Sequence, residues 1–85
     1  KSVEENYRVL RHQCELDVLG LPVLAGLSRK RLIWKPLDIT IDEALNGTTI
    51  VNTLALCGGA SILRVHDVKE AVQAVTLFNL YHKQD

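Results

Sequence analysis

The sequence has no excess of charge of either sign and no long hydrophobic run. Ten Lys and Arg residues balance ten Asp and Glu residues. The net charge therefore gives no reason to expect nucleic acid or an anionic membrane surface as a partner. No apolar stretch approaches the ~18 residues that a membrane span requires. Any recognition of an anion must depend on a local group of basic residues.

Cysteine and aromatic residues are also scarce. Cys14 and Cys57 are the only cysteines, and neither lies in a CxxC pair or at zinc-finger spacing from a histidine, so we expect two free thiols in a reducing cytosol. Tyr7 and Trp34 are isolated aromatics, which favours packing over base stacking. A signal peptide and an initiator methionine are missing, and we interpret Lys1 as a cut end.

The 85 residues that are present, 47% of them hydrophobic, suffice for at most one small domain. Residues 2–5 have the S-x-x-E form of a capping box, which predicts an amphipathic helix that stops at Gly20. The following run, 22–27, is almost wholly apolar. Such a run is typical of a parallel strand that is buried on both faces.

The middle of the sequence is harder to assign. Residues 31–38 contain a proline and no clear period, so we expect a loop with at most a helical turn. Residues 40–43 form a second capping box, which predicts a short helix that stops near 46–47. Segment 48–57 is β-branched at its start, as in a strand, yet its apolar residues follow helical spacing, and a helix is favoured.

Residues 61–66 indicate a second strand, and 67–81 a last helix for which Asp67 offers an N-cap. The predicted order is thus helix, strand, helix, strand, helix. Successive parallel strands joined by helices are the repeating unit of α/β folds. Two strands neither complete such a sheet nor close a barrel. We therefore expect an architecture larger than these 85 residues.

Basic residues occupy the ends of both predicted strands. Alternate side chains of a strand share a face, so Arg64 and His66 lie on the same side. Lys30 follows the first strand. Ligands of α/β barrels and doubly wound sheets bind at the carboxyl ends of the strands. We therefore expect these three residues to converge on an anion such as phosphate or diphosphate.

Each of these residues also has a structural explanation. Arg64 could form an ion pair at the sheet rim, and His66 could be a hydrogen-bonded structural histidine. Asp67 faces away from them, and an N-cap explains it better than a catalytic acid does. The basic run 29–31 is too short for a localisation signal. The pattern assigns no catalytic residue.

Three segments, GLPVLAGLSRKR, LNGTT and GGASILRVHDVKEAVQAV, resemble the dihydropteroate synthase family in their order and spacing. The resemblance extends over residues 1–85 and implies the C-terminal portion of one pterin-binding (β/α)₈ barrel domain. The implied enzyme is a transferase of folate biosynthesis that sulfonamides inhibit. It condenses hydroxymethyl-dihydropterin diphosphate with para-aminobenzoate, and the products are dihydropteroate and pyrophosphate.

The resemblance also implies roles for individual residues. Lys30 matches the lysine that contacts the pterin, and Arg64 and His66 match the pair that binds the diphosphate. Val65 lies between them and would supply main-chain contacts only.

Three further residues belong to the same candidate site. Gly26 and Ser28 lie on the side of the first strand that leads to Lys30, and their small size would leave room for the pterin ring. Arg31 stands where many family members have a serine near the aminobenzoate carboxylate.

The resemblance further implies a Mg²⁺ ion whose ligand residues lie outside this chain, and no metal site within it. Other pterin-binding residues belong to earlier strands, so we expect the 85-residue chain alone to be inactive. We also expect it to self-associate, because barrel strands without their neighbours expose unpaired edges and apolar surface. The intact enzyme would be a cytoplasmic homodimer, packed through helices that include 68–81. The alternatives are a pterin-binding methyltransferase domain and a non-catalytic phosphate-binding module.

Overall fold

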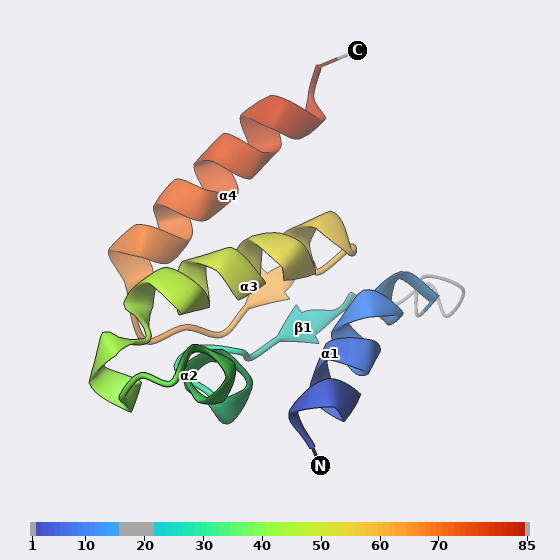
Figure 1. Cartoon of the computed structure of the whole chain (residues 1–85). Coiled ribbons are helices and arrows are strands. Elements are labelled where there is room, and N and C mark those ends of the chain that lie inside the picture. The colour runs from blue at the N-terminus through green and yellow to red at the C-terminus, as the bar shows by residue number, and fades with distance from the viewer. Residues whose placement is uncertain (1, 16–21, 85) are drawn as a thin grey trace.

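A computed structural model describes residues 2–15 and 22–84 of the chain (Figure 1). Its elements are α1 (Val3–Arg11), β1 (Leu24–Ala25), α2 (Arg31–Leu37), the 3-10 turn η2 (Ile41–Glu43), α3 (Leu45–Cys57), β2 (Ile62–Leu63) and α4 (Val68–His82). The predicted α/β order is confirmed, with α2 as an additional helix.

The two strands form a short parallel pair. Leu24 is in register with Ile62, and Ala25 with Leu63. The N–H of Arg64 donates to the carbonyl of Ala25 at 2.8 Å and continues the ladder beyond β2. Both strands are shorter than the sequence predicts.

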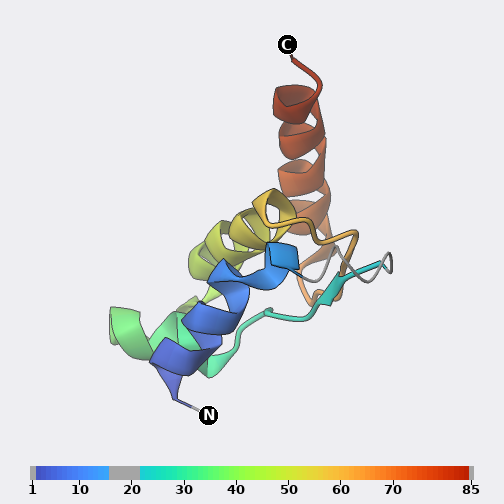
Figure 2. The same cartoon turned by 90° about the vertical axis from the view of Figure 1, so that its right-hand side faces the viewer.

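The prediction that both faces of the first strand are buried is wrong for the residues that the structure describes. Ala25 is 7% exposed, whereas Leu24 is 58% exposed. Figure 2 shows α1 and α3 on one side of β1. The residues that the structure describes therefore cover one face of the pair and leave the other open.

A cluster of core residues lies between α2 and α3. It contains Leu32, Ile33, Ala44 and Val51, with Tyr7 and Leu27 packed against it. Segment 48–57 is helical, as favoured, but the predicted stop at 46–47 is wrong because α3 runs through it. A Cβ atom on Gly47 would overlap Cγ2 of Ile33. Gly47 thus serves the close packing of α3 on α2 rather than helix termination.

The prediction of a loop over residues 31–38 is also wrong, since residues 31–37 form the helix α2. Pro36 lies in the last turn, where it has no N–H to donate to the carbonyl of Leu32 four residues earlier. The hydroxyl of Tyr7 donates to that carbonyl instead, at 2.7 Å. A contact from α1 therefore satisfies the acceptor that the proline leaves open.

Both predicted capping boxes are present. The Ser2 hydroxyl accepts the Glu5 N–H at 3.1 Å, and the Glu5 carboxylate accepts the Ser2 N–H at 3.2 Å. Helix α1 ends at Arg11, earlier than expected, and the predicted stop at residue 20 lies outside the described residues. The box at 40–43 opens a single 3-10 turn, η2, directly before α3.

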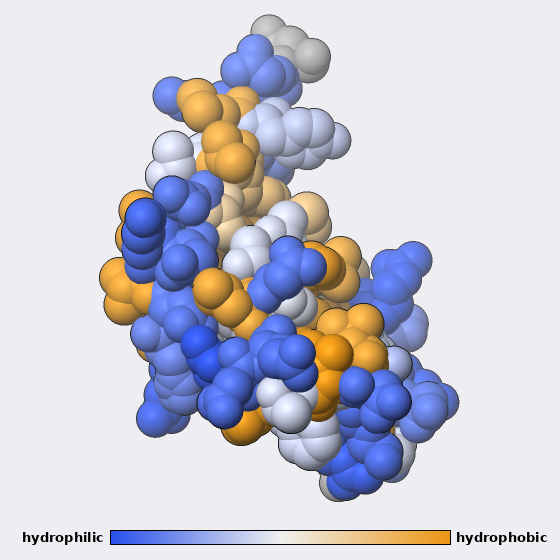
Figure 3. Space-filling model, turned by 60° about the vertical axis from the view of Figure 1, so that its left-hand side comes forward, coloured by the Kyte–Doolittle hydropathy of each residue, from blue (hydrophilic) through white to orange (hydrophobic). Residues whose placement is uncertain are grey.

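Helix α4 packs on α3 with its first half, and its second half extends away from the rest of the chain (Figures 1 and 2). Apolar side chains are exposed along α4 (Figure 3); among those more than half exposed are Val68, Val72, Leu77, Leu80 and Tyr81. The second half of the helix, which carries the last three of these, is called the α4 arm. None of the helices in the described part of the chain combines the length and apolar character that crossing a membrane requires.

Candidate functional site

Both strands lead to one hollow of about 400 Å³. It is lined by alternate residues of β1 and the segment after it, and by the segment that follows β2: Leu24, Gly26, Ser28, Lys30, Arg64, Val65 and His66. The structure therefore brings together Lys30, Arg64 and His66, the three basic residues expected to converge from the two strand ends. Their part in binding a diphosphate stays a prediction.

The basic side chains of the hollow are exposed. In the part of the chain that the structure describes, no ion pair involves Lys30, Arg64 or His66, so the alternative of a rim ion pair for Arg64 is not observed there. An arginine fork and a lysine ammonium that lack a carboxylate partner are suited to binding phosphate oxygens.

Two small residues connect the two sides of the hollow. The Ser28 hydroxyl accepts the N–H of His66 at 3.2 Å. A Cβ atom on Gly26 would lie 3.8 Å from Cβ of Arg64. Gly26 therefore leaves space beside Arg64, and Ser28 ties the segment after β1 to the segment after β2.

An ion pair that sequence reasoning missed lies directly beside the hollow. The Arg29 guanidinium donates to both carboxylate oxygens of Asp67, from Nε at 3.1 Å and from Nη2 at 2.9 Å. The two side chains are 27% and 19% exposed. Arg29 adopts a φ of 55°, and its N–H donates to Oγ1 of Thr48 at 3.0 Å. One residue thus links the end of β1 to α3 and to the start of α4.

The expectation that Asp67 caps the last helix needs correction. Asp67 occupies the N-cap position and its backbone carbonyl accepts the N–H of Ala71 at 3.1 Å, but its side chain makes no capping bond. The hydrogen bonds from Arg29 and its positive charge lower the pKa of the Asp67 carboxyl, and the same hydrogen bonds and the negative charge of Asp67 raise the pKa of Arg29. The sequence signal for this ion pair was a pair of opposite charges, Arg29 next to Lys30 and Asp67 next to His66.

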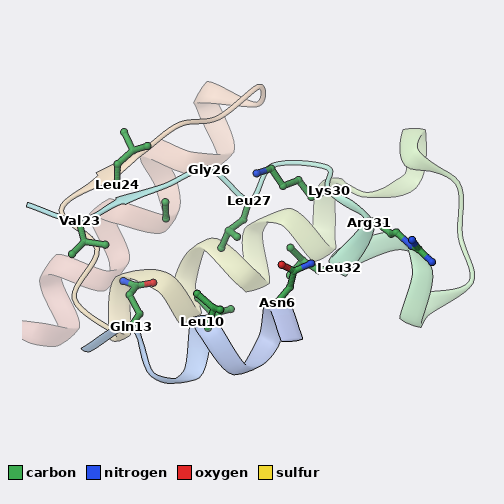
Figure 4. Close-up of a pocket in the computed structure, with 12 residues that line it drawn as sticks. Asn6, Leu10, Gln13, Val23, Leu24, Gly26, Leu27, Lys30, Arg31 and Leu32 are labelled. Atoms are coloured by element: carbon green, nitrogen blue, oxygen red, sulfur yellow. The ribbon is translucent and has the colours of Figure 1, made fainter. Parts of the chain in front are cut away.

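Arg31 lies apart from the hollow that contains Arg64 and His66. It is the first residue of α2 and lines a groove of about 410 Å³ between α1 and β1, which Lys30 also lines. Figure 4 shows the side chains of Lys30 and Arg31 pointing in different directions. The expected role of Arg31 at an aminobenzoate carboxylate stays a prediction.

The described residues do not fit a bound metal ion. They include no group of three or more His, Cys, Asp and Glu side chains close enough to coordinate one. Nothing in the chemistry of the hollow is therefore assigned to a metal.

Comparison with known proteins identifies the family of the chain. The family model described as "Pterin binding enzyme" matches residues 1–66. The chain therefore belongs to the pterin binding enzyme family.

Curated proteins that are similar to the chain include dihydropteroate synthases. The enzyme of Haemophilus influenzae is 47% identical over 68 residues, which are 80% of this chain and 25% of the relative. A Mycobacterium tuberculosis relative named "Inactive dihydropteroate synthase 2" is 40% identical over 68 residues, again 80% of this chain and 21% of the relative. The chain thus spans about a quarter of the length of these curated relatives.

Solved structures agree with the sequence relatives. The Vibrio fischeri 7,8-dihydropteroate synthase has a TM-score of 0.96 at 35% identity, and the match covers all of this chain and 32% of the Vibrio fischeri chain. The Coxiella burnetii enzyme, solved with pteroic acid, has a TM-score of 0.93 at 38% identity with the same coverage. The expected fold class, part of a (β/α)₈ barrel, is confirmed by this match.

Proposed function

We propose that the chain forms the diphosphate side of a dihydropteroate synthase active site. The observation that carries this proposal is the position of Lys30, Arg64 and His66 around one hollow at the carboxyl ends of two parallel strands. The substrates are hydroxymethyl-dihydropterin diphosphate and para-aminobenzoate. The family match and the relative solved with pteroic acid support a pterin ligand.

The chemistry of the reaction explains the need for cations. The aminobenzoate nitrogen attacks the pterin methylene carbon, a C–N bond forms, and the C–O bond to the diphosphate breaks. The electron pair of that bond leaves with pyrophosphate, and the amine loses a proton. Negative charge therefore grows on the leaving oxygen, where Arg64 and His66 would stabilise it more in the transition state than in the bound substrate.

Two features support a synthase over the alternatives. A pterin-binding methyltransferase has no diphosphate to hold, whereas this hollow gathers three basic side chains. A non-catalytic phosphate-binding module would not need the match to about a third of a dihydropteroate synthase barrel. Magnesium remains part of the proposal for the whole enzyme, with its ligand residues outside this chain.

We also propose that the whole enzyme is a homodimer that packs through helices including α4. The exposed apolar residues of the α4 arm, such as Leu77 and Tyr81, support this arrangement. The 85-residue chain alone should show no turnover, because it provides one side of the site.

A chimera tests the proposed reaction. The segment of the H. influenzae enzyme that matches this chain is replaced by the chain, and pyrophosphate release is measured with both substrates. We expect turnover, and the substitution Arg64→Gln should lower kcat/KM by about 100-fold, as loss of one charge-stabilising donor does.

The matched control is Arg8→Gln, which removes an exposed arginine of α1 and should leave turnover unchanged. A chimera without turnover, or one that tolerates Arg64→Gln as well as Arg8→Gln, would contradict the assignment.

A further inference from the structure

The geometry points to Arg29 and Asp67 as positioning residues that set how Lys30 faces Arg64 and His66 across the hollow. This inference rests on the proposed function and adds two residues that have no place in it so far. Neither side chain lines the hollow. Arg29 directly precedes Lys30, and Asp67 directly follows His66.

The contact between them fixes more than a distance. Two parallel hydrogen bonds, at 3.1 Å and 2.9 Å, join the guanidinium fork to the carboxylate. A bidentate pair of this kind constrains the relative rotation of its partners as well as their separation. Neighbouring Cα atoms are about 3.8 Å apart, so a shift of Arg29 or Asp67 displaces the adjacent Lys30 or His66.

Arg29 is itself held from several sides. Its N–H donates to Thr48 of α3, and its Nη1 donates to the carbonyl of Ile41 at 3.4 Å. The backbone at this position is left-handed, with a φ of 55°, and the Arg29 side chain bonds to Asp67 while that of Lys30 lines the hollow. Lys30, which lines the hollow, is therefore anchored through its neighbour Arg29, which does not line it.

Pyrophosphate binding tests this role, because positioning and simple electrostatics predict opposite results. The probe is inorganic pyrophosphate, titrated into the full 85-residue chain by calorimetry below the melting temperature of each variant. Asp67→Asn removes a negative charge next to an anion site, which by electrostatics alone would tighten binding. Positioning predicts at least a threefold weaker affinity.

Arg29→Lys keeps the charge but loses the bidentate fork, and it should weaken pyrophosphate binding to a similar extent. The control Glu70→Gln removes the same charge as Asp67→Asn, from the first turn of α4, and should not weaken binding. Equal or tighter binding by both Asp67→Asn and Arg29→Lys would overturn the positioning role. Absence of binding by the unsubstituted chain would instead overturn the proposed function.

A separate feature lies where α1 meets the end of α3. Cys14 and Cys57 are both free and exposed, and both line one hollow of about 330 Å³ together with Arg11. The adjacent residues are in contact: the Gln13 amide donates to the carbonyl of Ala55 at 3.1 Å and lies 3.7 Å from a Cβ built on Gly58. Gln13 and Ala55, which are 42 positions apart in sequence, are thereby held together beside the two cysteines.

We infer that Cys14 and Cys57 form a thiol pair that a low-molecular-weight disulfide can oxidise. The thiolate of one cysteine attacks oxidised glutathione and releases one glutathione thiolate. The second cysteine then attacks the mixed disulfide, forms the Cys14–Cys57 bond and releases the second glutathione. Two protein thiols are oxidised and one glutathione disulfide is reduced to two thiols.

Redox titration of the chain with reduced and oxidised glutathione, followed by mass spectrometry, tests this inference. A preformed pair should give an effective thiol concentration at least about tenfold higher in buffer than in concentrated urea. The variant Cys57→Ser should instead accumulate glutathione on Cys14. An internal disulfide that forms equally in urea, or two mixed disulfides in the native chain, would overturn the pair.

Discussion

At the scale of single residues, Gly47 shows how packing can override helix propensity. It lies in the first turn of α3, where its missing side chain makes room for Ile33 of α2. An alanine there would favour the helix by about 1 kcal/mol over glycine. It would also force Ile33 out of a core position that is only 2% exposed.

We therefore expect Gly47→Ala to lower the free energy of unfolding by about 1–2 kcal/mol, because the overpacking cost exceeds the gain in propensity. Urea denaturation followed by circular dichroism measures the change. Gly58→Ala is the matched control, since a Cβ there meets its nearest neighbours at an ordinary 3.5 Å. A stabilised Gly47→Ala variant would contradict the packing argument.

Asp67 should make part of the stability dependent on pH. Its hydrogen bonds with Arg29, together with the charge of Arg29, lower the pKa of Asp67 in the folded chain. The ion pair therefore stabilises the fold at any pH above the unfolded pKa of about 4. This contribution is lost as the pH falls through the folded pKa.

Asp67→Asn should accordingly lower the urea midpoint at pH 7 and reduce its decline between neutral and strongly acidic pH. Glu70→Gln, with the same change of charge, should retain that decline. An unchanged acid dependence in Asp67→Asn would show that the ion pair with Arg29 contributes nothing to stability.

Alternation along a strand was enough to place Arg64 and His66 on one face, since that period is a property of extended backbone, and the shared carboxyl end of the parallel strands brought Lys30 to them. It could not reveal the contact between Arg29 and Asp67. The two residues are 38 positions apart, and the left-handed backbone of Arg29 departs from the extended conformation that alternation requires. Only the fold brings them together.

At the scale of elements, α2 is the clearest departure from the sequence prediction. Pro36 indicates a loop by local rules because it breaks the hydrogen-bond pattern of a helix. A long-range donor, the Tyr7 hydroxyl, compensates for the missing N–H. Burial of Leu32 and Ile33, each 2% exposed, then holds the helix in place.

Tyr7→Phe should therefore destabilise the chain by about 1–2 kcal/mol, because it leaves the Leu32 carbonyl without a donor. In a Pro36→Ala background the restored N–H can serve that carbonyl, and the same substitution should cost less. A double-mutant cycle in urea measures this coupling. Tyr81→Phe, at a side chain that is 78% exposed, is the control, and a cycle with no coupling would reject the explanation.

At the scale of the whole molecule, apolar surface is distributed unevenly. Helix α4 contacts α3 only along its first half, and Leu77, Leu80 and Tyr81 beyond that contact are 55% to 78% exposed. Exposed contiguous apolar surface of this kind usually marks an interface. We therefore expect the chain to self-associate through the α4 arm.

Sedimentation velocity tests this expectation. Leu77→Lys should reduce the associated fraction several-fold, whereas Gln73→Lys, the same added charge at an exposed polar position of α4, should not. A monodisperse monomer that binds no anilinonaphthalene sulfonate would contradict self-association.

The order of helices and strands followed from capping boxes and apolar periodicity, which are local signals. The burial of the strands did not follow. An apolar run such as 22–27 indicates that both faces are meant to be covered, but it cannot say what covers them. Leu24 and Ile62 are 58% and 49% exposed on the face that the described helices leave open.

The parallel pair has one further consequence. In the part of the chain that the structure describes, β1 and β2 bond only to each other, so the outer edge of each strand retains donors and acceptors for another strand. A separate polypeptide that supplies neighbouring strands could extend this sheet from either side. Any activity recovered in such a mixture would depend on the concentrations of both pieces, and dilution would abolish it.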